Sequence, residues 1–165
     1  MQQARSESCL IGSWTVSTVE ELAPARSRLQ EALCQGAPWQ GAPAEPAHRA
    51  LLQNIVLAAS ELMANALRHA GGPARLDVVL EGTGITVSVM DRSPDDPPVL
   101  SPDRELGEGG FGLQLTLRMA DDVGWYRTTT GTKHVWARFS VPTPPGAAED
   151  PAGTETVGGP SETRV

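Results

Sequence analysis

Glu61 and Asn65 stand four residues apart in the segment SELMANALRHA, residues 60–70, which otherwise has the composition of a buried helix. Residues four apart lie on one helical face, so the carboxylate and the carboxamide are expected to lie one above the other. A helical Glu is usually solvated, whereas Asn is a mediocre helix former whose amide is expected to have a use there. The pair predicts an oxygen ligand for Mg²⁺ in Asn65 and, in Glu61, a carboxylate that orients and deprotonates a hydroxyl or water.

Asp91 ends an alternating apolar run, Ile85 to Val89, in which side chains point into a core or a cleft. A carboxylate placed there can accept a hydrogen bond from an amine, such as the exocyclic amine of adenine. An Asp that begins a turn before a loop is an equally good interpretation of the residue alone.

A cluster of four glycines in the six residues 107–112 leads directly into a short apolar segment. Glycine lets a backbone approach a phosphate and expose its N–H groups, and a helix N-terminus favours negative charge. The cluster is neither a Walker A loop, because no Gly-Lys-Ser/Thr follows, nor a dinucleotide fingerprint, because no strand leads into it. A flexible loop remains an alternative. Further on, the Gly131-Thr132 turn offers a hydroxyl to a base, or is a plain hairpin turn.

Hydrophobic periodicity predicts the elements that position these residues. A long helix over about 47–70 has one buried stripe and is stopped by Gly71-Gly72-Pro73; the stripe comprises Leu52, Ile55, Ala59, Leu62 and Ala66. The other predicted elements are a strand at 10–16, a helix from Ser17 or Thr18 to about Cys34, a hairpin of 76–80 with 85–91, a short helix at 113–121, and strands at 124–128 and 134–141. Local strand pairing and helices concentrated in the first half predict an α+β fold: a two-layer sandwich with helices on one face of a mixed, mainly antiparallel sheet.

The length of 165 residues suits one domain, expected over residues 10–142, with a disordered lead at 1–9 and a disordered Pro/Gly-rich tail at 143–165. The net charge is −7, and Lys133 is the only lysine. No basic patch is available for electrostatic binding to nucleic acid or to an anionic membrane.

The two cysteines, Cys9 and Cys34, have the spacing of neither a zinc site nor a disulfide framework. No signal-peptide pattern opens the chain, and no apolar run approaches about 20 residues. We therefore expect free thiols, no membrane span and a cytoplasmic location.

Taken in order, the Glu-x-x-x-Asn helix, the Asp after a strand, the Gly-rich loop and the Gly-Thr before a strand resemble the GHKL ATPase superfamily. This is the group of gyrase, heat-shock chaperones, histidine kinases and mismatch-repair proteins with the Bergerat ATP-binding fold. The phrase SELMANALRHA is most similar to the anti-sigma factor serine kinase branch, which includes small actinobacterial ATP-binding regulators. The resemblance covers about residues 10–142.

The resemblance implies that ATP lies between a helical layer and the sheet. It assigns Asn65 to Mg²⁺, Glu61 to the general base toward a seryl hydroxyl, and Asp91 to the adenine amine. Three groups of residues complete the implied site: Gly110, Gly112 and Leu113 along the phosphates, Thr132 at the adenine, and Arg68 and His69 on the phosphate side.

The resemblance also implies a function and partners. The protein would be an ATP-dependent serine/threonine protein kinase that phosphorylates a small anti-anti-sigma protein and sequesters a sigma factor, and it could form a homodimer. Contact with nucleic acid or a membrane is not expected.

The sequence departs from the family pattern after Asp91. The family has Asp-x-Gly-x-Gly there, whereas this chain has Ser93 and Asp95 at the glycine positions. Side chains at these positions would crowd the backbone against adenine. The departure supports an alternative function, a non-catalytic interaction module of the same fold with a degraded nucleotide site.

Overall fold

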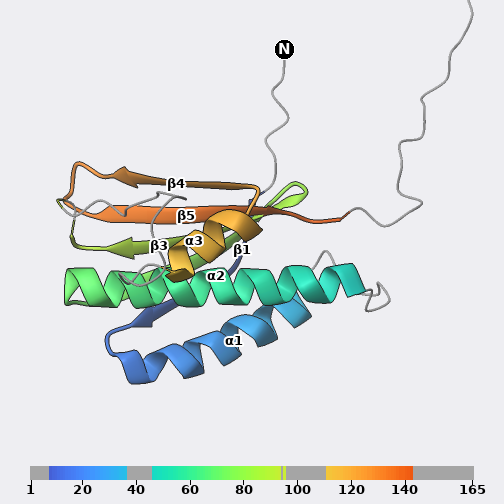
Figure 1. The fold of residues 1–165 in the computed structure, drawn as a ribbon, viewed down its shortest axis with the longest axis horizontal. Coiled ribbons are helices and arrows are strands. Elements are labelled where there is room, and N and C mark those ends of the chain that lie inside the picture. Colours follow the sequence, from blue (N-terminus) through green and yellow to red (C-terminus); the bar gives the residue numbers. More distant parts are fainter. Residues whose placement is uncertain (1–7, 37–45, 94, 96–110, 143–165) are drawn as a thin grey trace, which may run out of the picture.

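A computed structural model of the chain describes residues 8–36, 46–93, 95 and 111–142. One open sheet forms one layer, and helices form the other (Figure 1). The elements in chain order are β1 (Ser8–Val16), the 3₁₀ turn η1 (Val19–Glu21), α1 (Leu22–Gln35), α2 (Pro46–Ala70), β2 (Ala74–Glu81), β3 (Gly84–Asp91), α3 (Phe111–Met119), β4 (Asp122–Arg127) and β5 (Lys133–Ser140).

The sheet has five strands in the order β1-β2-β3-β5-β4. All four pairings within the described residues are antiparallel. The predicted α+β two-layer class is confirmed, and the described sheet contains no parallel pair. Between β3 and β5 the chain passes through α3 and β4. β4 runs in the same direction as β3, and β5 then runs antiparallel to both strands.

α2 is the central core helix. It packs against α1, α3 and strands β2, β3 and β5, and the predicted stripe faces inward, with Leu52 half-buried and its other members buried. By length and composition α2 could also cross a membrane, since an 18-residue window has a mean hydropathy of 1.3. The expectation that no apolar run approaches a membrane span was therefore too strong for this segment. Its apolar face is covered by the sheet and α1.

α1 is joined to α2 by packing and by a partly buried hydrogen bond. The predicted apolar side of this helix is turned inward, with Ala25, Leu29 and Leu33 buried. The Arg26 Nε donates to Ser60 Oγ of α2 at 3.0 Å, and Ser60 Oγ donates to the carbonyl of Val56 at 2.7 Å. The two helices are thereby fixed in register.

The start of this helical region carries the expected cap. The Glu21 carboxylate accepts hydrogen bonds from the backbone N–H groups of Ser17 at 2.6 Å and Thr18 at 3.4 Å. Such a contact supplies an acceptor to donors that a helix N-terminus leaves unpaired.

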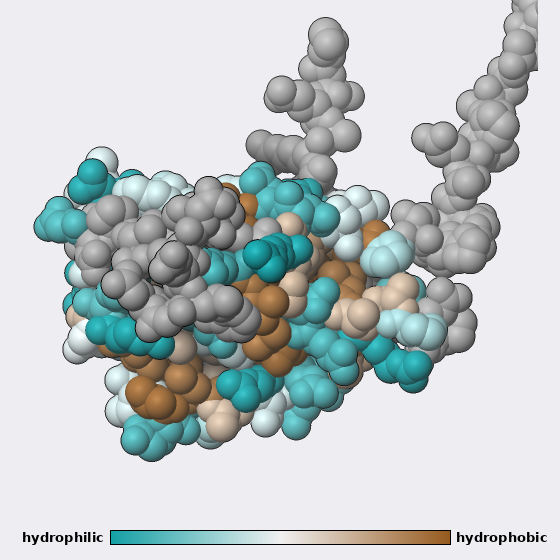
Figure 2. Space-filling model, in the orientation of Figure 1, coloured by the Kyte–Doolittle hydropathy of each residue, from teal (hydrophilic) through white to brown (hydrophobic). Residues whose placement is uncertain are grey.

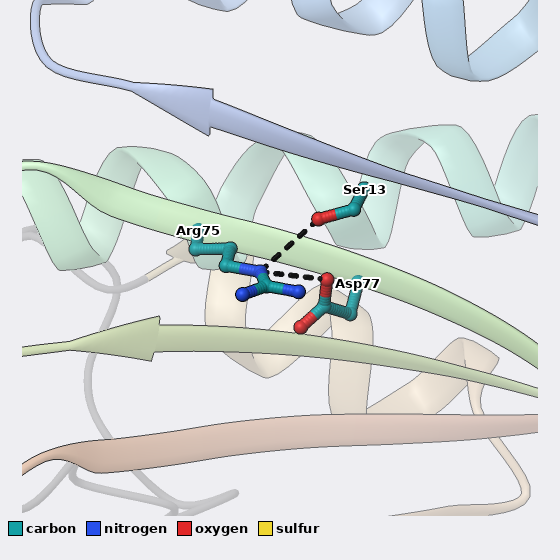
Figure 3. A network of polar contacts seen from close by, with 3 residues as sticks. All are labelled: Ser13, Arg75 and Asp77. Carbon is teal, nitrogen blue, oxygen red and sulfur yellow. Dashed lines mark hydrogen bonds and ion pairs between the residues drawn. The ribbon is translucent and has the colours of Figure 1, made fainter. Parts of the chain in front are cut away.

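The two faces of the sheet differ in character. The inward face buries alternate residues of β2, β3 and β5, including Leu76, Val87 and Phe139. The outward face is polar at its centre, where Arg75 Nε donates to Ser13 Oγ at 3.1 Å and to Asp77 Oδ1 at 3.0 Å (Figure 3). On the helical side, Figure 2 shows brown apolar patches over α2 and near the start of α1. Among the described residues, Leu57 of α2 and Val19 of η1 are large hydrophobic residues with exposed side chains.

The predicted elements are all present where the structure describes the chain, with boundaries shifted by one to three residues. Cys9 and Cys34 are free and exposed. Ser8 and Cys9, expected in the disordered lead at 1–9, belong to β1 instead. Four predictions lie outside the described residues: the rest of that lead, the disordered tail at 143–165, most of the loop after Arg92, and the glycines from 107 to 110.

Candidate functional site

One end of the molecule collects most of the predicted site residues. α2 ends at Ala70 and the chain re-enters the sheet at Ala74; the start of β2 pairs with the end of β3, and Asp91 pairs with Lys133 at the start of β5. The last turns of α2 therefore lie at the same end as Asp91 and the turn before β5, on the left in Figure 1. A ligand held between these parts would contact all of them.

Glu61 and Asn65 are half-buried, whereas their neighbours Leu62 and Ala66 are buried. The two polar residues therefore lie at the border between the core face and the open face of α2. Asn65 Oδ1 accepts a hydrogen bond from Arg68 Nη1 at 3.2 Å. The Arg68 guanidinium, which is expected on the phosphate side of the site, is here hydrogen-bonded to the carboxamide oxygen of Asn65.

Asn65 is the predicted Mg²⁺ ligand among the described residues. No group of three or more His, Cys, Asp and Glu side chains that could hold a metal occurs among them, so they contain no preformed carboxylate-rich metal site. Mg²⁺ is commonly held by one or two protein oxygens together with water and substrate phosphates. The residues therefore fit a metal that arrives with a nucleotide, and the Arg68 guanidinium must leave Oδ1 when it does.

Asp91 is not open to solvent. Its carboxylate is 2% exposed, and Lys133, its direct cross-strand partner, is 3% exposed. The Lys133 Nζ lies 3.3 Å from Asp91 Oδ2, and the backbone N–H of Ser93 donates to Asp91 Oδ1 at 2.8 Å. Both oxygens of the carboxylate assigned to adenine are therefore already hydrogen-bonded or ion-paired within the protein.

The loop after Asp91 begins as an Asx turn, in which the Asp side chain accepts from the backbone two residues on. No described residue other than glycine has a positive φ, so Ser93 and Asp95 do not need glycine for their backbone conformation here. The Asp95 carboxylate forms an exposed ion pair with Arg127 Nη1 at 3.6 Å. This contact joins the loop to the end of β4.

The Thr132 hydroxyl belongs to a local network in the turn between β4 and β5. Thr132 Oγ1 and Thr128 Oγ1 are 2.6 Å apart, and Thr130 Oγ1 lies 2.8 Å from Thr128 Oγ1. Gly131 has a φ of +80°, which glycine adopts without a steric cost. Thr132 therefore stabilises the turn in this structure, and its hydroxyl can donate to a base only when it accepts from Thr128 instead of donating to it.

His134 follows Lys133 on the opposite face of the sheet. Its ring stacks on Tyr126 with centroids 4.7 Å apart and an interplanar angle of 6°. Burial lowers the pKa of His134 below its ordinary value; the nearby Arg75 charge adds to this effect, and the charges of Asp77 and Asp91 oppose it. His134 is therefore held toward its neutral form.

The remaining predicted residues are placed only in part. Gly112 and Leu113 lie in the first turn of α3, which packs on α2, and Gly110 lies outside the described residues. His69 is exposed near the end of α2. The contact of Lys133 with Asp91 was not predicted, although two signals were available: it is the only lysine, and its place in the alternation of β5 turns it inward.

A hollow lies between α1 and the N-terminal half of α2, away from the end of the molecule that carries Asp91. It has a volume of about 550 Å³. Its lining residues are Arg26, Gln30, Cys34, Arg49, Leu52, Gln53, Val56 and Leu57. None of the predicted site residues lines it.

Comparison with known families and structures agrees with this architecture. The family described as the histidine kinase-like ATPase domain matches residues 15–139. The chain belongs to this family, as the resemblance to GHKL ATPases implied.

The fold is shared with the crystal structure of the RsbU and RsbW domains of Rv1364c from Mycobacterium tuberculosis, with a TM-score of 0.51 and 18% identity. The similarity covers 78% of this chain and 32% of that one, so this chain corresponds to about a third of the larger structure. No match was found among curated proteins.

Proposed function

We propose that the protein is an ATP-binding regulator that phosphorylates a serine or threonine of a small anti-anti-sigma protein and sequesters a sigma factor. The observation that carries the proposal is the placement of Glu61 and Asn65. They lie half-buried on one face of α2, at the end of a histidine kinase-like ATPase domain where its Asp91 also lies. Similarity to a structure containing an RsbW domain supports a role among partner-switching regulators.

In this proposal each residue has a separate task. Asn65 holds Mg²⁺ through its carboxamide oxygen, and Arg68 moves from that oxygen toward the phosphates. Glu61 accepts the proton of the substrate hydroxyl while the hydroxyl oxygen forms the new bond to the γ-phosphorus, the bond from that phosphorus to the β–γ bridging oxygen breaks, and ADP leaves. ATP supplies the phosphoryl group, and its Mg²⁺ offsets the charge on the transferred group. Such a reaction depends mainly on positioning, which a rigid core helix provides.

Phosphate transfer tests the proposal. A pull-down with the full chain, with and without Mg-ATP, recovers candidate partners, and labelled ATP then reports transfer to them. Glu61→Ala and Glu61→Gln should retain nucleotide binding and lose transfer by about 100-fold or more, the usual worth of a general base. Glu31→Ala, which removes an exposed carboxylate of α1, is the matched control. Unchanged transfer by Glu61→Ala would show that the proposed base is wrong.

A non-catalytic interaction module of the same fold is the second candidate. It is favoured by one specific observation, the engagement of both Asp91 oxygens by Lys133 and Ser93, together with the side chains at the two expected glycine positions. Calorimetric titration that detects no binding at millimolar Mg-ATP would select this function over the kinase.

A further inference from the structure

Lys133 contacts the carboxylate of Asp91, the residue that the proposed nucleotide site assigns to the base. The residues are paired in register on adjacent strands and both point to the inward face. The backbone therefore holds the lysine within reach of the carboxylate, and the distance of 3.3 Å is a consequence of this register. Asp91 is almost fully buried. A ligand can therefore contact its carboxylate only if Lys133 moves away, or if Lys133 and the ligand contact the carboxylate together.

We infer that Lys133 is a specificity-determining residue of the nucleotide site, and that it makes the protein accept purine nucleoside triphosphates with either an amino or an oxo group at position 6. The inference rests on the proposed nucleotide-binding function. It adds a substrate class to that function, namely purine nucleotides without discrimination for adenine.

The first reason is the relative strength of the two possible contacts to Asp91. The Lys133 ammonium and the Asp91 carboxylate attract each other as opposite charges at 3.3 Å. The exocyclic amine of adenine is neutral, so it can donate a hydrogen bond to the carboxylate but lacks this attraction. It therefore does not displace the Lys133 ammonium, and the base is read by the pair and not by Asp91 alone.

The second reason is the donor and acceptor inventory of the pair. Lys133 offers only donors, and the ionised Asp91 offers only acceptors. A 6-amino purine presents a donor amine beside an acceptor ring nitrogen, and a 6-oxo purine presents an acceptor oxygen beside a donor N–H. The pair can satisfy either edge, whereas a carboxylate alone would leave a 6-oxo group opposite an acceptor.

Competitive binding of ATP and inosine triphosphate tests the inference, because these nucleotides differ at position 6 and at the adjacent ring nitrogen. Both are titrated with Mg²⁺ into the full chain. We expect dissociation constants within about threefold of each other. In Lys133→Met, which keeps the side-chain length and removes the charge, we expect at least a tenfold preference for ATP, as for a site in which a carboxylate reads the amine. Lys133→Arg keeps the cation and should retain the wild-type ratio.

Each outcome separates the inference from the proposed function. A tenfold or greater preference for ATP in the wild-type protein overturns the inference and leaves the proposed function intact, and this comparison needs no variant to fold. An unchanged ratio in a folded Lys133→Met protein also overturns it. Absence of binding by both nucleotides at millimolar concentration overturns the proposed function, and the inference with it.

Discussion

Asp91 of β3 and Lys133 of β5 form a buried cross-strand ion pair, with 3.3 Å between Oδ2 and Nζ. The chain has a net charge of −7, and this pair lies at the residue that the proposed function assigns to the base. Desolvation of such a pair is costly and its mutual attraction offsets that cost only while both partners are present. The pair therefore affects both stability and ligand access.

Removing one partner of this pair should destabilise the fold. Lys133→Met leaves the Asp91 charge buried and without its partner, so we expect the free energy of unfolding to fall by about 3–5 kcal/mol. The measurement is urea denaturation followed by circular dichroism.

The double variant Asp91→Asn with Lys133→Met is the control for that prediction. It removes both charges and keeps an acceptor for the Ser93 N–H, so it should be less destabilised than Lys133→Met alone. Costs of the two single variants that simply add would contradict a direct coupling between the residues.

Asn65→Ala should weaken the binding of Mg-nucleotide and leave metal-free nucleotide binding unchanged. The loss of a group that orders a metal site typically costs about 10–100-fold in metal affinity. We therefore expect the Mg²⁺-dependent part of the nucleotide affinity to fall by about tenfold or more. Mg²⁺ alone should not bind measurably, because the described residues contain no group of three or more His, Cys, Asp and Glu side chains that could hold a metal.

Calorimetric titration of nucleotide with and without a chelator separates Mg²⁺-dependent binding from metal-free nucleotide binding. Gln53→Ala, which truncates an exposed amide in the other half of α2, is the matched control. An equal loss of affinity with and without Mg²⁺ would assign Asn65 to the nucleotide itself and not to the metal.

Most of the fold could be predicted because local pattern and tertiary burial agree. The stripe containing Ile55 and Leu62 is buried, and the alternation of β3 and β5 matches their inward and outward faces. Strand pairing between distant segments was open at the sequence level, because alternation fixes a face and not a neighbour. This is why a mixed sheet was expected and only antiparallel pairs are described.

The site could be predicted by residue but not by contact. The spacing of Glu61 and Asn65 placed them on one face, and both lie at the border of the core. The engagement of Asp91 by Lys133 depends on the β3–β5 register, which spans about 40 residues of chain and leaves no local signal. Likewise, the Ser93 and Asp95 positions read as obstacles in sequence, whereas the Ser93 backbone supports Asp91.

The fold should lose stability as the pH falls below neutrality, partly through His134. Its pKa is lowered by burial, so the unfolded chain binds the proton first. Stability from this group is complete above the unfolded pKa of about 6.5 and is lost as the pH falls through that value toward the lower folded pKa.

Thermal unfolding of the wild type and His134→Gln between pH 8 and pH 5 measures this effect. The melting temperature of the variant should depend less steeply on pH. His69→Gln, at an exposed position of α2, should keep the wild-type slope. A steeper slope in His134→Gln would contradict the direction of the shift.

Gly124→Ala should destabilise the sheet because of a specific neighbour. Gly124 is the direct cross-strand partner of Trp136, and a Cβ on Gly124 would lie 2.5 Å from Trp136 Cζ2 and 2.7 Å from Cε2. The indole covers the glycine, so an added methyl group forces the ring aside. Crowding of this kind costs about 1–3 kcal/mol.

The sign of the Gly124→Ala effect should reverse when the ring is removed. Gly124 does not have a positive φ, so alanine can adopt its backbone conformation. In a Trp136→Ala background the substitution should then be neutral or stabilise by about 0.4–1 kcal/mol, because alanine restricts the unfolded chain. Denaturant unfolding of both single variants and the double variant gives the coupling between the two positions. The same destabilisation by Gly124→Ala in both backgrounds would show that the indole is not its cause.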